Sequence, residues 1–264
     1  MREVEAAIVE RAFIRVAGPD AAAYLQGQLS QDVSADSGLA WLLDPTGKAV
    51  ALVRFLRDDD GFLLDTDPQV ADAVLARLRR FLLRTKATVE PVEDLHLVRV
   101  FGAEPLDGAH PAAAWSDDGA QDLFCADPAA EVAALGATLL EPDEHERRRI
   151  LAGVPVSGID VDGDTIPAEA GRWTIEQGVS FTKGCYTGQE LVARIDSRGG
   201  NVPRPLRVLR FDGPVAVGAE VRVDGDVVGH LTSAAGDVAL GPIMRKVEPG
   251  AAVSVDGTSG SVDS

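Results

Sequence analysis

The sequence contains little cysteine and few aromatic residues. It has two cysteines, Cys125 and Cys185, in 264 residues, and aromatic side chains make up 5% of the chain. Two cysteines cannot build a disulfide framework, and no C-x-x-C pair indicates a metal site. We therefore expect a reducing compartment, predict a cytoplasmic protein, and assign no metal ligands.

Long apolar runs and an excess of basic charge are also absent. No run is long and apolar enough to span a membrane, and the first residues lack the apolar core of a signal peptide. Lys and Arg number 25 against 42 Asp and Glu, a formal net charge of −17. Because binding to nucleic acid needs a basic surface that displaces counterions, direct contact with nucleic acid is not expected. A small basic pocket for an anionic ligand is not excluded.

The length suits two or three packed domains. Strand and helix patterns alternate in the first third of the chain, and turns at Asp44–Gly47 and Asp58–Gly61 indicate antiparallel hairpins. Near the other end, short extended runs separated by glycine and aspartate turns indicate a small antiparallel barrel or sandwich, followed by a polar, frayed tail at Gly257–Ser264. We predict an α+β fold in three parts: residues 1–92, 93–202 and 203–264.

The most informative stretch is the octapeptide Lys183-Gly184-Cys185-Tyr186-Thr187-Gly188-Gln189-Glu190. Thr187 and Glu190 have the T-x-x-E spacing of a capping box, and the apolar residues that follow have helical spacing, so a helix is predicted to begin here. Glycines at positions 184 and 188 are expected to let the chain turn sharply. Arg194 either pairs with Glu190 as an i, i+4 neighbour or faces an anionic partner.

Cys185 is the candidate nucleophile of this stretch. It is predicted to lie just before the positive end of a helix dipole and two residues after the ammonium of Lys183. Both influences favour thiolate over thiol, which is typical of a reactive cysteine. The alternative is a small buried cysteine in a turn shaped by glycines. Local physical chemistry leaves both interpretations open.

The octapeptide resembles the signature K-G-C-Y-x-G-Q-E of the YgfZ-like family, folate-binding relatives of the glycine-cleavage T-protein, an aminomethyltransferase. The similarity continues over nearly the whole chain, in the segments Gly18–Gly27, Arg149–Pro155, Ile166–Glu169 and Gly229–Ala234. The resemblance implies T-protein-like folate-binding domains around a central cavity, with a C-terminal antiparallel β-barrel.

The resemblance also implies site residues. Cys185 is the catalytic candidate, and the other candidates around it are Lys183, Gly184, Tyr186, Gly188, Gln189, Glu190 and Arg194. Arg149 matches an arginine that T-proteins place on the folate, and a guanidinium fits the carboxylated tail in a bidentate fork. Asp122 falls where T-protein relatives place a glutamate that contacts the pterin ring.

One departure from the T-protein pattern concerns acid–base chemistry. True aminomethyltransferases carry an aspartate on the second hairpin strand, just after the glycine turn. Here the segment Gly47–Val53 has alanine or valine at that place. Because no local carboxylate can do that work, the glycine-cleavage reaction is not expected.

By resemblance, the function is to bind tetrahydrofolate or a derivative and to support the assembly or repair of iron–sulfur clusters, so that cluster-dependent tRNA modification is affected. Cys185 would trap a folate-derived group or meet a cluster or persulfide, and the implied partners are iron–sulfur assembly proteins or client enzymes. Two alternatives stay open. One is a folate-dependent one-carbon transferase acting on an unknown substrate, and the other is a scaffold that binds folate only to hold one conformation.

Overall fold

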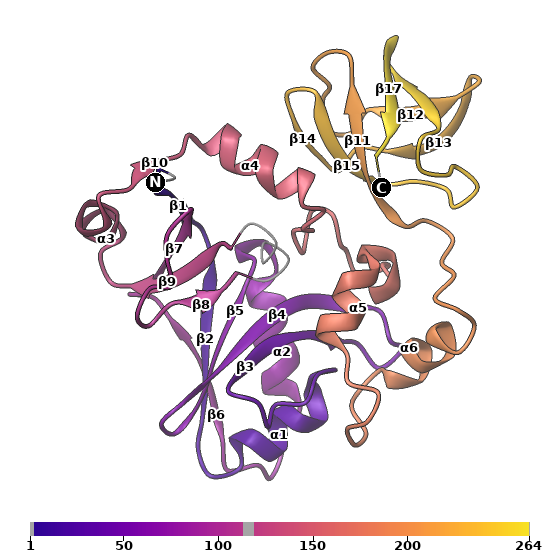
Figure 1. Ribbon diagram of the computed structural model, residues 1–264. Coiled ribbons are helices and arrows are strands. Elements are labelled where there is room, and N and C mark those ends of the chain that lie inside the picture. Colours follow the sequence, from indigo (N-terminus) through magenta and orange to yellow (C-terminus); the bar gives the residue numbers. More distant parts are fainter. Residues whose placement is uncertain (1–2, 113–118, 264) are drawn as a thin grey trace.

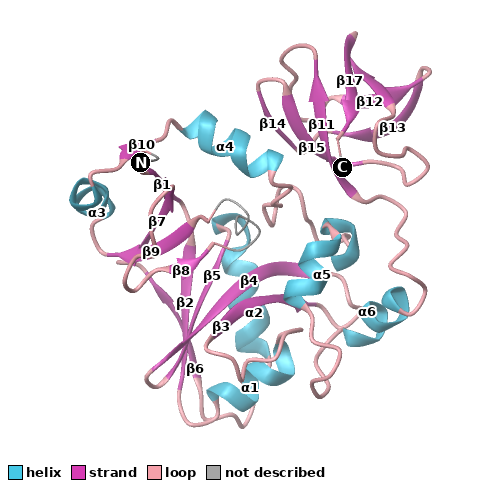
Figure 2. Cartoon of the chain, viewed as in Figure 1, coloured by secondary structure: helices cyan, strands magenta, loops and turns pink. Residues whose placement is uncertain are grey.

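The computed structural model describes residues 3–112 and 119–263, and these form two mixed α and β regions and a C-terminal sheet (Figures 1 and 2). The first sheet has the strand order β3-β4-β5-β2-β6, with every neighbouring pair antiparallel. Its strands are β2 (Ala12–Ala17), β3 (Ser37–Leu43), β4 (Ala49–Asp58), β5 (Gly61–Thr66) and β6 (Thr88–Val92). The two predicted hairpins are confirmed.

Both faces of this first sheet are covered. The helices α1 (Ala21–Gln28) and α2 (Ala71–Arg80), the latter preceded by a 3-10 turn η1 (Pro68–Val70), pack on one face through the buried residues Leu25 and Leu78. The other face packs on residues 161–192 through Trp41 and Leu43. This explains the apolar run at residues 39–43 of β3, because that part of the strand is covered on both faces of the sheet.

The second sheet has the order β10-β1-β7-β9-β8. Its strands are β1 (Glu5–Val9), β7 (His96–Phe101), β8 (His110–Pro111), β9 (Gln121–Cys125) and β10 (Thr138–Leu139). The N-terminal strand β1 therefore lies between β10 and β7, so the predicted boundary at residue 92 does not follow the sheets. Ala6 of β1 is fully buried against Val98 and Val100 of β7, which places this strand in the second core.

Helices connect and cover these sheets. They are α3 (Pro128–Leu135), α4 (Pro142–Leu151), the 3-10 turn η3 (Pro167–Ala170), α5 (Arg172–Gly178) and α6 (Gln189–Asp196). The helix predicted over Pro142–Leu151 is confirmed as α4, which runs from the second sheet to the C-terminal sheet (Figure 1). None of the helices in the described residues has the length and apolar character needed to cross a membrane.

The C-terminal sheet is antiparallel and curls into a half-barrel with the order β13-β12-β16-β17-β11-β15-β14. Its strands are β11 (Leu206–Phe211), β12 (Glu220–Val223), β13 (Asp226–His230), β14 (Ser233–Ala235), β15 (Val238–Pro242), β16 (Ala252–Val255) and β17 (Thr258–Val262). The frayed tail predicted after residue 256 is wrong, because β17 pairs with both β16 and β11. Val262 is buried, and a Cβ at Gly260 would lie 2.4 Å from the Arg210 carbonyl oxygen, so glycine lets these strands approach.

Candidate functional site

The signature loop, residues 183–190, lies against the first sheet. The backbone N–H of Thr187 donates to the Gly27 carbonyl at the end of α1, with an N···O distance of 3.1 Å. Gly188 has a φ of +84°, and a Cβ there would lie 2.7 Å from the carbonyl oxygen of Asp44 in the β3–β4 turn. The signature loop therefore packs against the end of segment Gly18–Gly27 and against the first hairpin. Two of the segments that resemble the YgfZ-like family, far apart in the sequence, are thus in contact.

Lys183 ties the loop to the chain that follows α1. Its ammonium donates to the carbonyls of Leu29 at 2.7 Å and Gln31 at 2.8 Å, and it lies 5.4 Å from the centre of the Tyr186 ring. Burial lowers the pKa of Lys183 to about 8. The Lys183 ammonium is thus hydrogen-bonded to two backbone carbonyls. That it also favours the thiolate form of Cys185 stays a prediction.

The predicted capping box is wrong. Helix α6 begins at Gln189 with Gly188 as its N-cap, and Thr187 lies outside the helix. The Gln189 side chain instead accepts from the backbone N–H of Tyr186 at 2.9 Å. The reason is the left-handed conformation of Gly188, which starts the helix after the threonine. Gly184, by contrast, does not have the positive φ expected of it.

The exposed face of α6 carries the two charged candidates of the loop region. Glu190 and Arg194 are both exposed. No ion pair joins them in the part of the chain that the structure describes, so the predicted i, i+4 pair is not formed. Of the two interpretations of Arg194, an anionic partner outside this chain stays a prediction.

The two thiols have different environments. Cys185 is exposed, whereas Cys125 in β9 is half-buried, and burial raises the pKa of the Cys125 thiol. The interpretation of Cys185 as a small buried residue is therefore wrong. Its reactivity stays a prediction that the exposure of the side chain makes testable.

Alkylation with iodoacetamide at neutral pH is expected to modify Cys185 about tenfold faster than Cys125. Accessibility and the raised pKa of Cys125 act in the same direction. Mass spectrometry of the peptides during the reaction measures both rates, and Cys185→Ser should leave only the slow phase. A fast phase that disappears in Cys125→Ser instead would contradict this assignment.

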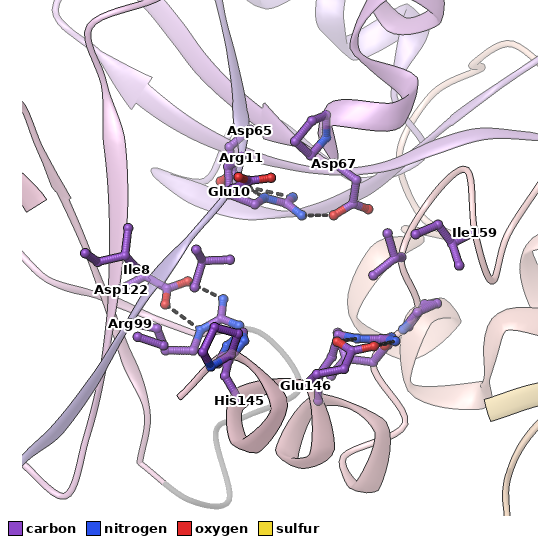
Figure 3. A pocket seen from close by; sticks show the side chains of 18 of the residues that line it. Ile8, Glu10, Arg11, Asp65, Asp67, Arg99, Asp122, His145, Glu146 and Ile159 are labelled. Carbon is purple, nitrogen blue, oxygen red and sulfur yellow. Dashed lines mark hydrogen bonds and ion pairs between the residues drawn. The ribbon is translucent and has the colours of Figure 1, made fainter. Parts of the chain in front are cut away.

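A central cavity of about 690 Å³ lies between the two sheets, α4 and residues 154–159 (Figure 3). Its volume is within the range of small-molecule sites. Apolar side chains form part of its wall, including the partly exposed Ile8, Leu139 and Ile159. No residue of the signature loop is among the described residues that line it. The structure therefore brings Asp122 and Arg149 to one cavity and places Cys185 elsewhere.

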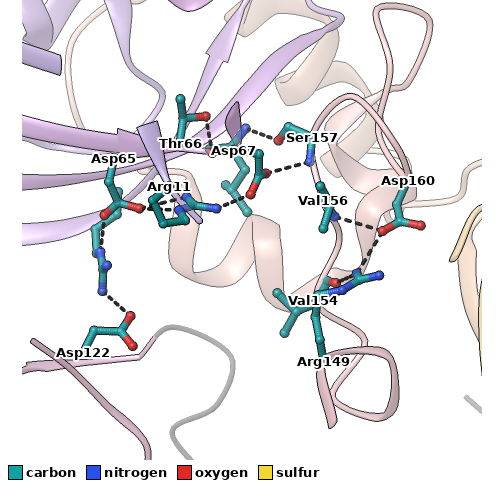
Figure 4. A network of polar contacts seen from close by, with 12 residues as sticks. Arg11, Asp65, Thr66, Asp67, Asp122, Arg149, Val154, Val156, Ser157 and Asp160 are labelled. Atoms are coloured by element: carbon teal, nitrogen blue, oxygen red, sulfur yellow. Dashed lines mark hydrogen bonds and ion pairs between the residues drawn. The ribbon is translucent and has the colours of Figure 1, made fainter. Parts of the chain in front are cut away.

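Asp122 belongs to a buried chain of ion pairs at this cavity (Figure 4). Its carboxylate accepts from Arg99 at 2.7 Å and from Arg54 at 2.8 Å. Arg54 also binds Asp65 at 2.6 Å, and Asp65 binds Arg11 at 2.8 Å. Burial raises the pKa of Asp122, but the Arg99 and Arg54 guanidiniums outweigh it and hold the pKa below its usual value. Asp122 is thus an ionised carboxylate with two arginine partners.

Arg149 lines the cavity, but its guanidinium has partners within the chain. Nε and Nη2 donate to the Glu146 carboxylate at 2.8 and 2.7 Å, and Nη1 donates to Asp160 at 2.9 Å and to the Val154 carbonyl. The same Asp160 accepts from the Ser233 hydroxyl of β14 at 2.7 Å. Arg149 therefore holds α4, residues 154–160 and the half-barrel together. Its predicted contact with the carboxylated tail of folate stays a prediction. Nε, Nη1 and Nη2 already donate to acceptors within the chain.

Several cavity residues were not singled out from the sequence. Asp65 lies near the end of the largely apolar strand β5, and a carboxylate in such a strand indicates a buried ion pair. Asp67, interpreted only as a helix start, accepts from Arg11 and from the Ser157 N–H. His145 of α4 lines the cavity too, and burial lowers its pKa to about 4. No sequence motif marks Arg11 or His145.

The two-sheet body, the half-barrel and the cavity define the class, a T-protein-like fold. The crystal structure of the glycine cleavage system aminomethyltransferase T from Bartonella henselae matches with a TM-score of 0.76 over 99% of this chain and 85% of that one. Its sequence identity is 18%, so this likeness shows the fold alone.

Sequence similarity then identifies the family. The chain is 30% identical over 293 residues to the human mitochondrial iron-sulfur cluster assembly factor IBA57, covering 93% of this chain and 81% of the relative. It is 32% identical over 218 residues to the tRNA-modifying protein YgfZ of Klebsiella pneumoniae, covering 72% and 66%. No protein-family profile matches. The chain belongs to the family of YgfZ and IBA57, as the octapeptide predicted.

Proposed function

We propose that this protein binds tetrahydrofolate or a derivative and supports the assembly or repair of iron–sulfur clusters in other proteins, and through them cluster-dependent tRNA modification. The names of its relatives describe iron–sulfur cluster assembly and tRNA modification, and we carry both roles to this chain. The observation that carries the proposal is an exposed thiol, Cys185, on a loop anchored to a folate-enzyme fold. Because the human relative is mitochondrial, the cytoplasmic location stays a prediction.

The central cavity supports the folate half of the proposal. Its volume of about 690 Å³ suits a pteridine with its aryl extension. Ile8, Leu139, Ile159 and Trp173 offer apolar surface for flat rings. Among the residues that the structure describes, seven acidic side chains and four arginines line the cavity. Carboxylates accept hydrogen bonds from donors such as the amino and ring N–H groups of a pterin. We therefore propose that the pterin enters the cavity and the carboxylated tail points toward the opening.

The separation of Cys185 from the cavity supports a division of roles. A thiol outside the folate pocket is placed to meet a partner protein, a cluster or a persulfide rather than a group carried on the pterin. Thiolate chemistry suits those encounters. We do not propose a one-carbon transferase, because β4 has only alanine, valine and leucine between Ala49 and Val53.

Two variants are expected to separate the two roles. In calorimetric titrations with tetrahydrofolate, Cys185→Ser should bind like the wild type, whereas Ile159→Glu should weaken binding about tenfold or more, because it replaces apolar cavity wall by a carboxylate that repels the carboxylated tail of the ligand. Ile159 is 44% exposed, so its replacement should leave the fold intact. In cells lacking the protein, Cys185→Ser should fail to restore cluster-dependent tRNA modification, measured by mass spectrometry of the nucleosides.

The matched control is Val217→Glu, an equally apolar position that is 62% exposed and outside the cavity. It should bind folate and restore modification like the wild type. Unchanged folate affinity in Ile159→Glu would refute the cavity assignment. Full restoration by Cys185→Ser would refute the role of the thiol while leaving the cavity assignment standing.

A further inference from the structure

We propose a second ligand site, in a groove between α5, α6 and the connection from α6 to β11, for a small molecule with an apolar body and one anionic head group. The groove has a volume of about 730 Å³, similar to that of the central cavity. No described residue lines both of them. Residues of α5 and α6 line the groove together with the first residues of β11, Leu206 and Arg207, and with Arg245, which follows β15; Figure 1 shows the chain that leads from α6 up to β11.

The floor of the groove is apolar. Ile175 lies on α5, and Val179 follows the last residue of that helix in an extended conformation. Val192 and Ile195 stand three residues apart on one face of α6. Phe181 also lines the groove and is 52% exposed. An exposed ring beside buried aliphatic side chains offers a surface on which a planar or aliphatic body loses water.

The charged groups of the groove differ from those of the central cavity. Arg207 and Arg245 line it and form no ion pair within the described residues. The four arginines of the central cavity, in contrast, are all paired with carboxylates. Because no carboxylate of the described residues pairs with either guanidinium, both are available to an anion from outside the chain.

The Arg207 side chain has a buried donor, Nε, that faces no hydrogen-bond acceptor among the described residues. A buried donor without an acceptor costs free energy that a ligand oxygen would recover. Guanidinium groups bind carboxylate and phosphate oxygens through paired donors. Of the acids in the groove, Glu176 is bound to Arg172 at 2.6 Å, and Asp196 has no ion-pair partner among the described residues.

The backbone at the end of α6 keeps the groove open. Gly199 and Gly200 have φ values of +81° and +68°, a conformation that side-chain-bearing residues rarely adopt. The chain thereby turns away from α6 without a side chain that would fill the groove, and leads to Val202 and Pro205 on its wall.

The test uses 8-anilinonaphthalene-1-sulfonate, an aromatic anion whose fluorescence rises on transfer from water to an apolar site. Arg207→Gln and Phe181→Ala should each weaken binding of this dye to the native protein about tenfold. The matched control Arg198→Gln, on the same segment but outside the groove, should bind like the wild type. Ile159→Glu in the central cavity should also leave the affinity unchanged. Competition by decanoate and by naphthyl phosphate then distinguishes a carboxylate from a phosphate head group.

Thermal unfolding of each variant shows whether it is folded in the assay. If Arg207→Gln is unfolded, Phe181→Ala tests the proposal alone, because its position is exposed. Equal dye affinity in Phe181→Ala and Arg198→Gln would overturn the proposal. Loss of dye binding in Ile159→Glu alone would place the dye in the central cavity and overturn it as well. Absence of dye binding to the wild type would have the same consequence.

Discussion

Replacing Gly188 by alanine is expected to lower the free energy of unfolding by about 2–4 kcal/mol, the sum of a left-handed backbone penalty and an overpacked contact. The residue has a φ of +84°, and a Cβ would lie 2.7 Å from the Asp44 carbonyl oxygen and 2.8 Å from the Leu43 Cβ. Both neighbours belong to the first hairpin, which cannot move without disturbing the buried sheet. Urea unfolding measures the change.

Gly184→Ala is the matched control within the same loop. A Cβ there meets nothing within 4 Å, and its φ is not in the left-handed region, so the change should stay within about 0.5 kcal/mol. The alkylation rate of Cys185 provides a second readout, since a displaced loop changes the access to the thiol. Equal stabilities of the two variants would show that Gly188 does not fix the loop to the hairpin.

Asp122→Asn is expected to cost about 3–5 kcal/mol of unfolding free energy, the effect of removing one partner from a buried ion pair. Asp122 is fully buried, and its carboxylate is shared by Arg99 and Arg54. Neutralising it leaves Arg99 in the cavity wall without this carboxylate, and leaves Arg54 with Asp65 alone. Urea unfolding at pH 7 measures the loss.

The control for Asp122→Asn is Asp58→Asn, which removes an exposed pair with Arg15 and should cost at most about 1 kcal/mol. The pH dependence has a definite sign. Because the pKa of Asp122 is lowered in the folded protein, its carboxylate stabilises the fold above the unfolded pKa of about 3.9, and this contribution is lost as the pH falls further. The difference between wild type and Asp122→Asn should therefore shrink in acid. A cost as small as that of the control would mean that the arginines find other partners.

The arginines of the central cavity and those of the groove beside α6 differ in whether they are paired with carboxylates. Around the central cavity, guanidiniums and carboxylates are paired with one another in a row that joins the two sheets, so a ligand there must use the remaining acceptors and the apolar wall. In the groove beside α6, Arg207 and Arg245 have no such partners among the described residues. The affinities of ligands for the central cavity and for the groove should therefore depend differently on the salt concentration.

Local sequence patterns were sufficient for many elements. Turn residues at Asp44–Gly47 predicted the first hairpin, and a proline followed by acids and then by basic residues predicted α4. Such signals act within a few residues, through backbone conformation and the helix dipole. The octapeptide was sufficient for the family, because a run of specific residues is far less frequent by chance than a glycine-rich turn.

The sequence by itself thus determined the α+β class, the antiparallel C-terminal sheet and the membership of the family. Only the tertiary structure decided that β1 joins the second sheet, that β17 is a strand, that Gly188 caps α6, and that Cys185 stands apart from the cavity. It also decided that Arg149 is paired with Asp160, and Asp122 with Arg54, which is 68 residues away. These outcomes depend on which distant segments meet, and pairing between distant segments leaves no periodic pattern in the chain.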